Sequence, residues 1–184
     1  MSERLVLGVT GSPGTGKSTV AQYLNDEHDF TIFESSSIIK ARAKFDGLKL
    51  VDRAGYDSFF RNQQNIHGKS WLADLMIKSD VGNVVQSGLR AKYDFLRIKE
   101  AGGVVIALSC PPQICIDRID TSNPKNPQTV DEYVEHQLIE ESINDFGTHT
   151  NWCVNNADYN IDTSQPIADT LHLVSEVVAE LLAK

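Results

Sequence analysis

The sequence predicts an α/β fold with three layers, α/β/α, in which helices cover both faces of a five-stranded parallel sheet. Short apolar runs alternate with amphipathic segments along the chain, as in repeated strand–helix units. The run over residues 103–108 is almost continuously apolar, which is typical of a parallel strand buried on both faces. A glycine-rich segment over residues 11–16 separates the first apolar run from the first amphipathic one.

The same patterns place the individual elements along the chain. We expect strands over residues 4–10, 30–33, 83–86, 103–108 and 159–162. We expect helices over residues 17–27, 35–45, 56–79 with a break at Gly68, 93–101, 111–119, 129–138 and 167–182. We expect the helix after the second strand to be capped by Ser35, Ser36 or Ser37, and the pair Thr129 and Glu132 forms a capping-box pattern.

Chain length and composition indicate a single domain over residues 1–184. The chain is 41% hydrophobic and 23% charged, which suits a globular protein that buries one core without staples. The formal net charge of −8 argues against nucleic acid and anionic membranes as partners, because their phosphate groups repel an acidic surface. A small anion can still bind where the local charge is positive.

The lack of a recognisable targeting signal and the pattern of cysteines favour a cytoplasmic protein. The first apolar run, residues 5–9, is too short for a signal peptide and leads directly into the glycine-rich segment. No segment approaches the roughly 18 apolar residues that a membrane span needs. Cys110, Cys115 and Cys153 have no metal-ligand spacing, and an odd number of cysteines suits free thiols in a reducing compartment.

Residues 11–18, GSPGTGKS, match the pattern G-x-x-x-x-G-K-[ST] of a phosphate-binding loop. Glycines let successive N–H groups turn toward phosphate oxygens, and the following helix directs the positive end of its dipole at them. Lys17 supplies a cation to the β and γ phosphates, and the Ser18 hydroxyl is a hard oxygen ligand for Mg²⁺. The motif predicts binding of ATP or a similar triphosphate, with Mg²⁺. The expected binding residues are Gly11, Ser12, Pro13, Gly14, Thr15, Gly16, Lys17, Ser18 and Thr19.

Polar residues follow several predicted strands, at the ends where ligands of open α/β sheets bind. They are Glu34 to Ser37 after the second strand, Ser87 to Arg90 after the third, and Ser109 to Pro112 after the fourth. Among them we favour Arg90, because a guanidinium at that place can hold a phosphate through two parallel hydrogen bonds. A solvated arginine at a helix start is the alternative.

Two further cations are candidates for the site. Lys40 lies one helical turn beyond the second strand, although the basic stretch that contains it also suits a solvated helix face. Arg118 borders a proline-containing loop over residues 120–128, and a cation at the hinge of a closing loop would stabilise a transferring phosphoryl group. An ordinary surface charge beside Asp117 or Asp120 is the alternative for Arg118.

These segments resemble the P-loop nucleotide and nucleoside monophosphate kinases, a group that includes adenylate kinase, dephospho-coenzyme A kinase and phage-type deoxynucleoside monophosphate kinases. The resemblance covers nearly the whole chain and rests on GSPGTGKST, SSSIIKA, NVVQSGLR, CPPQICIDRI and ADYNIDTS. It implies a P-loop kinase fold with a helical acceptor-binding region over about residues 35–80 and a short lid over about 118–130.

The resemblance also implies an activity and roles for residues. It implies that ATP donates its γ-phosphoryl group to a small nucleotide-like acceptor: a nucleoside or deoxynucleoside monophosphate, or dephospho-coenzyme A. Lys17, Arg90 and Arg118 would be catalytic, Lys40 and Arg90 would bind the acceptor, and Ser18 would bind the metal.

The sequence departs from this group at charged positions. Ser87 and Ser37 stand where aspartates are common, and residues 120–128 offer a single cation, Lys125. An unusual acceptor, a slower enzyme or a protein that binds nucleotide without turnover would each fit these departures. Residues 52–55 match the D-x-x-G of GTP switches, but the sequence has no N-K-x-D segment. The amides at 62–65 either read a base edge or form a polar helix face, and the oligomeric state stays open.

Overall fold

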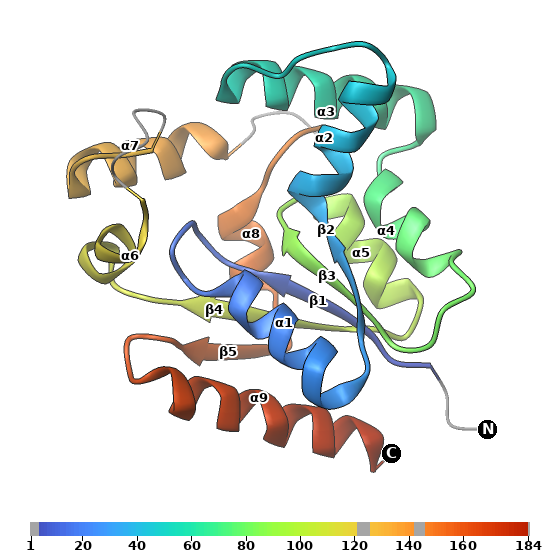
Figure 1. Ribbon diagram of the computed structural model, residues 1–184, viewed down its shortest axis with the longest axis vertical. Helices are drawn as coiled ribbons and strands as arrows, with labels where there is room; N and C mark the ends of the chain where they lie inside the picture. The colour runs from blue at the N-terminus through green and yellow to red at the C-terminus, as the bar shows by residue number, and fades with distance from the viewer. Residues whose placement is uncertain (1–3, 121–125, 142–145, 184) are drawn as a thin grey trace.

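Residues 4–120, 126–141 and 146–183 are described by the computed structural model, without the side chains of Arg53 and Glu140. Five strands form one sheet in the order β2-β3-β1-β4-β5, and every neighbouring pair is parallel (Figure 1). The strands are β1 (Val6–Thr10), β2 (Thr31–Glu34), β3 (Val84–Leu89), β4 (Val104–Ser109) and β5 (Tyr159–Asp162). The helices are α1 (Lys17–His28), α2 (Ser35–Phe45), α3 (Arg53–His67), α4 (Trp71–Ile77), α5 (Lys92–Glu100), α6 (Pro112–Arg118), α7 (Val130–Glu140), α8 (Thr150–Asn155) and α9 (Ile167–Leu182).

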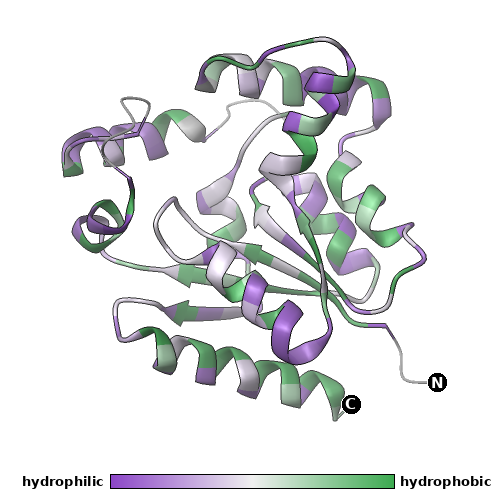
Figure 2. Cartoon of the chain, in the orientation of Figure 1, coloured by the Kyte–Doolittle hydropathy of each residue, from purple (hydrophilic) through white to green (hydrophobic). Residues whose placement is uncertain are grey.

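Two hydrophobic cores lie on opposite faces of the sheet, because side chains alternate along each strand. Leu7 and Val9 of β1 pack with α1 and α9, whereas Val6 of the same strand packs with α4, α5 and α8. Figure 2 shows that the central strands and α9 are predominantly hydrophobic, whereas α7 is mostly hydrophilic. The predicted three-layer α/β/α fold with a five-stranded parallel sheet is confirmed.

Helices α2 and α3 lie beyond the ends of β2 and β3 (Figure 1), and α4 extends from them onto the face of the sheet, where it packs beside α5. Their apolar side chains make a separate cluster that includes Ile39, Phe60 and Trp71. The predicted break lies at Gly68, whose φ of 104° ends α3, and α4 begins at Trp71. These helices lie within residues 35–80, and the role of this region in binding the acceptor stays a prediction.

Three predictions about the elements were wrong or incomplete. Strand β3 was expected to end at Gln86 but continues to Leu89. The pairing of β3 with β1 shifts register at Gly88, whose φ of +74° allows the strand to continue past the irregularity. Glu34 precedes α2 without a side-chain cap, so the predicted serine caps lie inside the first turn of that helix. Helix α8 was not predicted, since its six residues are too few to show a periodic pattern.

The capping box ahead of α7 is confirmed in part. The Thr129 side chain accepts a hydrogen bond from the Glu132 backbone N–H, while the Glu132 carboxylate accepts from the N–H of Gln128 instead of Thr129 (2.7 Å). Within the described residues, no helix is both long and apolar enough to cross a membrane.

Candidate active site

The glycine-rich loop joins β1 to α1 at the carboxyl end of the sheet (Figure 1). Gly11, Gly14 and Gly16 have φ values of 141°, 80° and 91°, which L side chains rarely adopt. A Cβ atom on Gly14 would overlap the backbone of Cys115, so α6 packs directly on the loop. The Tyr133 hydroxyl of α7, which packs with Cys115, donates to the Pro13 carbonyl at 2.6 Å and also holds the loop.

Lys17 is the first residue of α1, and its side chain reaches back to the loop. Its Nζ donates a hydrogen bond to the Ser12 carbonyl at 2.6 Å. A phosphate oxygen bound in the loop would compete with this carbonyl for the Lys17 ammonium group. Desolvation of the ammonium group, together with the positive charge of Arg90, lowers the Lys17 pKa to about 7. The Glu34 carboxylate acts in the opposite direction. The structure therefore brings Lys17, Arg90 and Glu34 within electrostatic reach of one another.

Glu34 and Arg90 come from the ends of neighbouring strands. Glu34 lies beside Ser87 in the parallel register of β2 and β3. The close approach also shows at Gly88, where a Cβ atom would lie 3.2 Å from Glu34 Oε1. Beyond the end of β3, the Arg90 carbonyl accepts a hydrogen bond from the His149 N–H at 2.7 Å. Sequence reasoning counted Glu34 among the strand-end residues but gave it no role; strand register, which the sequence does not show, pairs it with Ser87.

Hydroxyl groups of the kind that bind Mg²⁺ lie at the start of α1 and in β1 and β3. Ser18 is exposed, so its hydroxyl can face a bound triphosphate. The buried hydroxyls of Thr10 and Ser87 have no hydrogen-bond partner within the described part of the chain. No group of three or more His, Cys, Asp or Glu residues that could hold a metal is found there. These residues fit a Mg²⁺ ion that takes most of its ligands from triphosphate and water, with Ser18 as the protein ligand.

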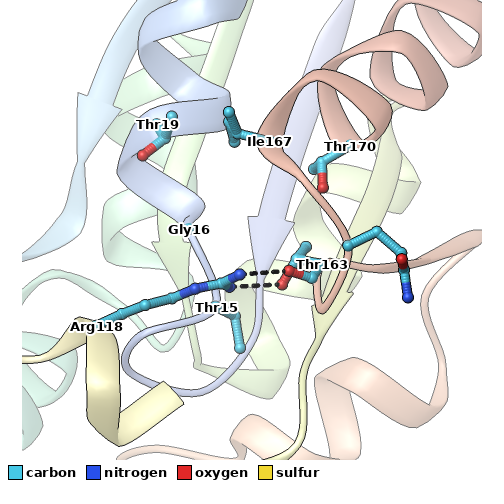
Figure 3. A pocket seen from close by; sticks show the side chains of 8 residues that line it. Thr15, Gly16, Thr19, Arg118, Thr163, Ile167 and Thr170 are labelled. Carbon is cyan, nitrogen blue, oxygen red and sulfur yellow. Dashed lines mark hydrogen bonds between the residues drawn. The ribbon is translucent and has the colours of Figure 1, made fainter. Parts of the chain in front are cut away.

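A pocket opens beside the loop, between the start of α1 and the turn that precedes α9 (Figure 3). It is lined by Thr15, Gly16, Thr19, Arg118, Thr163, Gln165, Ile167 and Thr170. The Arg118 side chain reaches from the end of α6 across the pocket, and its Nη2 donates to the Thr163 carbonyl at 2.8 Å. Arg118 therefore borders the pocket, and its catalytic role stays a prediction.

Lys40 lies farther from the loop. The residue is exposed on α2, and its Nζ is 6.0 Å from the centroid of the Tyr56 ring on α3. This geometry does not join it to Arg90, so a role for Lys40 in the acceptor site stays a prediction. Lys125, the cation expected in the lid, lies outside the described residues; residues 118–120 and 126–130 are the described parts of that predicted lid.

Helix α3 supports the Arg90 side of the site through buried amides. Gln64 is buried, and it accepts from the Gly147 N–H and donates to the Lys69 carbonyl, both at 2.9 Å. Gln63 is 1% exposed, and its Oε1 has no partner among the described residues. The polar helix face is therefore buried at Gln63 and Gln64, and a long-range hydrogen bond from Gly147 covers it at Gln64.

The segment 146–149 links α3 to Arg90. Lys69 Nζ lies 5.0 Å from the Phe146 ring centroid and 4.5 Å from that of Tyr93 on α5. Since His149 also holds the Arg90 carbonyl, this segment fixes the backbone at the end of β3. Sequence reasoning missed it because the residues have neither a motif nor a periodic pattern.

The D-x-x-G match of residues 52–55 has a structural explanation. Asp52 precedes α3, and its Oδ1 accepts a hydrogen bond from the Gly55 N–H at 2.8 Å. This is an ordinary helix N-cap. The motif therefore gives no support to a GTP switch.

The strand order and the loop between β1 and α1 define the class of the protein, a P-loop kinase of the superfamily that contains the nucleoside monophosphate kinases. A family model described as AAA domain matches residues 7–140, which is more than half of the chain, so the chain belongs to that family. The resemblance seen in the sequence is thereby confirmed at the level of the superfamily.

Curated relatives and solved structures agree with this class. The chain is 24% identical over 172 residues to a shikimate kinase of Staphylococcus aureus, with 94% of this chain and 88% of the relative covered. It is similar in structure to a shikimate kinase from Acinetobacter baumannii in complex with shikimate, with a TM-score of 0.64 and 14% identity, over 99% of this chain and 95% of that one. A gluconokinase from Sinorhizobium meliloti gives a TM-score of 0.58 and 15% identity, over 98% and 94%. The chain is an ATP-dependent phosphotransferase that acts on a small molecule.

Proposed function

We propose that the protein transfers the γ-phosphoryl group of ATP to a small anionic acceptor bound between the ends of β2 and β3 and helices α2 and α3. The observation that carries this proposal is the grouping of Lys17, Arg90 and Glu34 at the phosphate loop. A nucleoside monophosphate and a hydroxy acid of the shikimate or gluconate kind both have the two features such an acceptor needs, an anionic group and a hydroxyl or phosphoryl oxygen.

The residues of the donor side would position ATP. The loop N–H groups would cradle the phosphates, and Lys17 would leave the Ser12 carbonyl for the β and γ phosphates. Arg118 and the pocket around Thr163 would hold the nucleoside end of ATP. Mg²⁺, held by Ser18 and the triphosphate, would neutralise charge on the oxygens of the β and γ phosphates.

The acceptor side would supply one cation and one carboxylate. Arg90 would grip the anionic group of the acceptor, and Glu34 would accept the proton of an acceptor hydroxyl as its oxygen forms the new bond to the γ-phosphorus. The bond from that phosphorus to the β–γ bridging oxygen breaks, and ADP leaves. Glu34 would also stand in for the aspartate that this chain lacks at position 87, because it lies beside Ser87 in the sheet.

The test is acceptor-dependent release of ADP from Mg²⁺-ATP, measured with nucleoside monophosphates, dephospho-coenzyme A, shikimate and gluconate in turn. We expect turnover with one chemical class, and Lys17→Ala should abolish it while leaving the circular dichroism spectrum unchanged. Binding of an ATP analogue without turnover on any acceptor would instead support the catalytically silent module. Consumption of GTP in preference to ATP would support a switch.

A further inference from the structure

Two of the three cysteines lie side by side at the start of α6. Cys110 directly follows β4, Pro111 is the N-cap of α6, and Cys115 is the fourth residue of the helix. Side chains at these two places of a helix start often pack against each other as a staple. Cys110 does pack against the cluster that contains Cys115, and its side chain is in hydrogen-bond contact with the Cys115 thiol. Cys115 Sγ also donates to the Cys110 carbonyl at 3.7 Å.

The two thiols differ in their access to solvent. Cys110 is half-buried, whereas Cys115 is 0% exposed. Arg118, at the end of α6, directs its Nη1 at Cys110 Sγ from 3.6 Å. Cysteines that react with disulfides are typically reached by solvent and lie beside a positive charge. Cys110 is therefore the thiol that meets a reagent first, and Cys115 is the neighbour that can resolve the product.

This pair of cysteines touches the donor site at two places. The Cys115 backbone packs so closely on Gly14 that a Cβ atom there would overlap the Cys115 carbonyl. Arg118 contacts Cys110 through Nη1 and donates through Nη2 to the Thr163 carbonyl, on the wall of the pocket beside the loop. A change in the way the two cysteines pack therefore reaches both the phosphate loop and the pocket.

We propose that Cys110 and Cys115 form a reversible disulfide bond that weakens ATP binding, with a low-molecular-weight disulfide such as glutathione disulfide as the oxidant. The Cys110 thiolate attacks one sulfur of the oxidant, forms a mixed disulfide and releases one glutathione thiolate. Cys115 then loses its proton and attacks the Cys110 sulfur, so that the second glutathione leaves. The two protein thiols give up two electrons and two protons, which the two glutathione molecules take up. In a reducing compartment the pair returns to free thiols.

The bond would weaken ATP binding because its formation moves α6. An S–S bond is about 2.05 Å long, much shorter than a non-bonded contact between two sulfur atoms. Strand β4 is paired on both sides, with β1 and β5, so the short helix α6 is the element that yields. The Cys115 backbone then shifts against Gly14, and Arg118 loses the Cys110 thiol as a partner.

Peptide mapping tests the bond itself. The protein would be equilibrated at rising ratios of oxidised to reduced glutathione, alkylated in denaturant and digested with trypsin. Residues 100–118 form one tryptic peptide that contains both Cys110 and Cys115, whereas Cys153 lies in the peptide of residues 126–184. We expect the first peptide to lose two hydrogens and to carry neither an alkyl group nor glutathione, while Cys153 stays free. Dithiothreitol should restore both thiols.

Two variants, each lacking one buried thiol, are matched for this experiment. Cys115→Ala leaves Cys110 without its partner, so Cys110 should retain one glutathione. Cys153→Ala should form the disulfide as the wild-type protein does. Alkylation of both thiols of the peptide at every glutathione ratio would overturn the proposal. Wild-type protein that accumulates glutathione on Cys110 while Cys115 stays free would also contradict it, because Cys115 would then fail to resolve the mixed disulfide.

Affinity for a non-hydrolysable Mg²⁺-ATP analogue tests the consequence and needs no acceptor, so its failure is distinct from failure of the proposed function. We expect the Kd of oxidised wild-type protein to rise about tenfold or more, the factor for loss of one charge-assisted contact, with an unchanged circular dichroism spectrum. Cys110→Ser cannot form the bond, so its Kd should not depend on the glutathione ratio. A disulfide that leaves the wild-type Kd unchanged, or an equal rise in Cys110→Ser, would refute the control of ATP binding by this pair.

Discussion

At the scale of single residues, the loop lysine is kept in an environment that disfavours its own charge. Burial and the nearby Arg90 lower the Lys17 pKa to about 7, so close to neutral pH the free protein holds this site partly uncharged. Phosphates would reverse the balance, because their negative charge favours the ammonium form. Binding of ATP is therefore coupled to binding of a proton.

The first prediction follows from that coupling. At a pH one unit above the Lys17 pKa, binding of a non-hydrolysable Mg²⁺-ATP analogue should take up close to one proton, and one unit below it almost none. Isothermal titration calorimetry in buffers of different ionisation enthalpy measures the number. Lys17→Arg is the matched control, since an arginine stays charged and should take up no proton. Equal uptake in both proteins would assign the proton to another group.

Arg90 carries the second prediction at this scale. If its guanidinium grips the acceptor, Arg90→Ala should reduce kcat/KM for the acceptor by about 100-fold, the loss expected for one bidentate charge-assisted contact. Affinity for the ATP analogue should change little. Arg90→Lys should recover only part of the loss, because a point charge lacks the planar fork. Neither substitution removes the hydrogen bond from the His149 N–H to the carbonyl of residue 90, so the backbone should stay in place.

Comparison of kcat/KM for the acceptor with the affinity for the ATP analogue decides this prediction. A parallel loss of ATP-analogue binding and acceptor use would assign Arg90 to the donor side. Wild-type kinetics in both variants would place the acceptor away from β3.

At the scale of elements, helices α6 and α7 hold the phosphate loop in its strained form. The carbonyl of Cys115 in α6 occupies the space beside Gly14, and Tyr133 of α7 donates to Pro13. Burial raises the Tyr133 pKa far above its usual range, so the hydroxyl remains a donor at any physiological pH. Cys115 and Tyr133, from elements that follow β4, therefore shape the phosphate loop through its backbone.

The third prediction concerns this support. Tyr133→Phe removes one hydrogen bond and leaves the packing intact, so unfolding should become easier by about 1 kcal/mol. The KM for ATP should rise by a few-fold, up to about tenfold, because the loop loses one anchor. Tyr23→Phe is the matched control: its hydroxyl bonds to Ser175 Oγ between α1 and α9, away from the loop. Equal effects of the two substitutions on KM would show that only stability had changed.

The sequence predicted the elements that carry a strong period or motif and missed those defined by distant partners. Strand β5 and helix α9 have the bounds expected from the pattern, and the phosphate loop follows from its spacing alone. The inward turn of Ser35 and the burial of Gln64 depend on Gln86 and Gly147, residues 51 and 83 positions away. The position of Glu34 beside Ser87 depends on the register of β2 and β3, which cannot be predicted from a local sequence pattern.

At the scale of the whole molecule, two titratable groups make stability depend on pH in opposite ways. The pKa of Asp94, which is 1% exposed in the first turn of α5, is raised from 3.8 to about 7 on folding, so the folded state binds the extra proton and loses stability as pH rises through this range. The Lys17 pKa is lowered from 10.5 to about 7, so stability increases as pH rises from about 7 toward 10.5. Both groups therefore make the folded state least favoured near neutral pH, where the site would work.

The last prediction is a minimum in the free energy of unfolding near pH 7, measured by urea denaturation between about pH 5 and pH 9. Each limb should have a slope of at most about 1.4 kcal/mol per pH unit, the value for one proton. Asp94→Asn should remove the falling limb below pH 7, and Lys17→Met the rising limb above it. A saturating Mg²⁺-ATP analogue should also remove the rising limb, because bound phosphate restores the Lys17 charge. A maximum in the wild-type free energy of unfolding near neutral pH, unchanged by either substitution, would contradict the burial of both groups. The protein would then keep its site without a cost in stability.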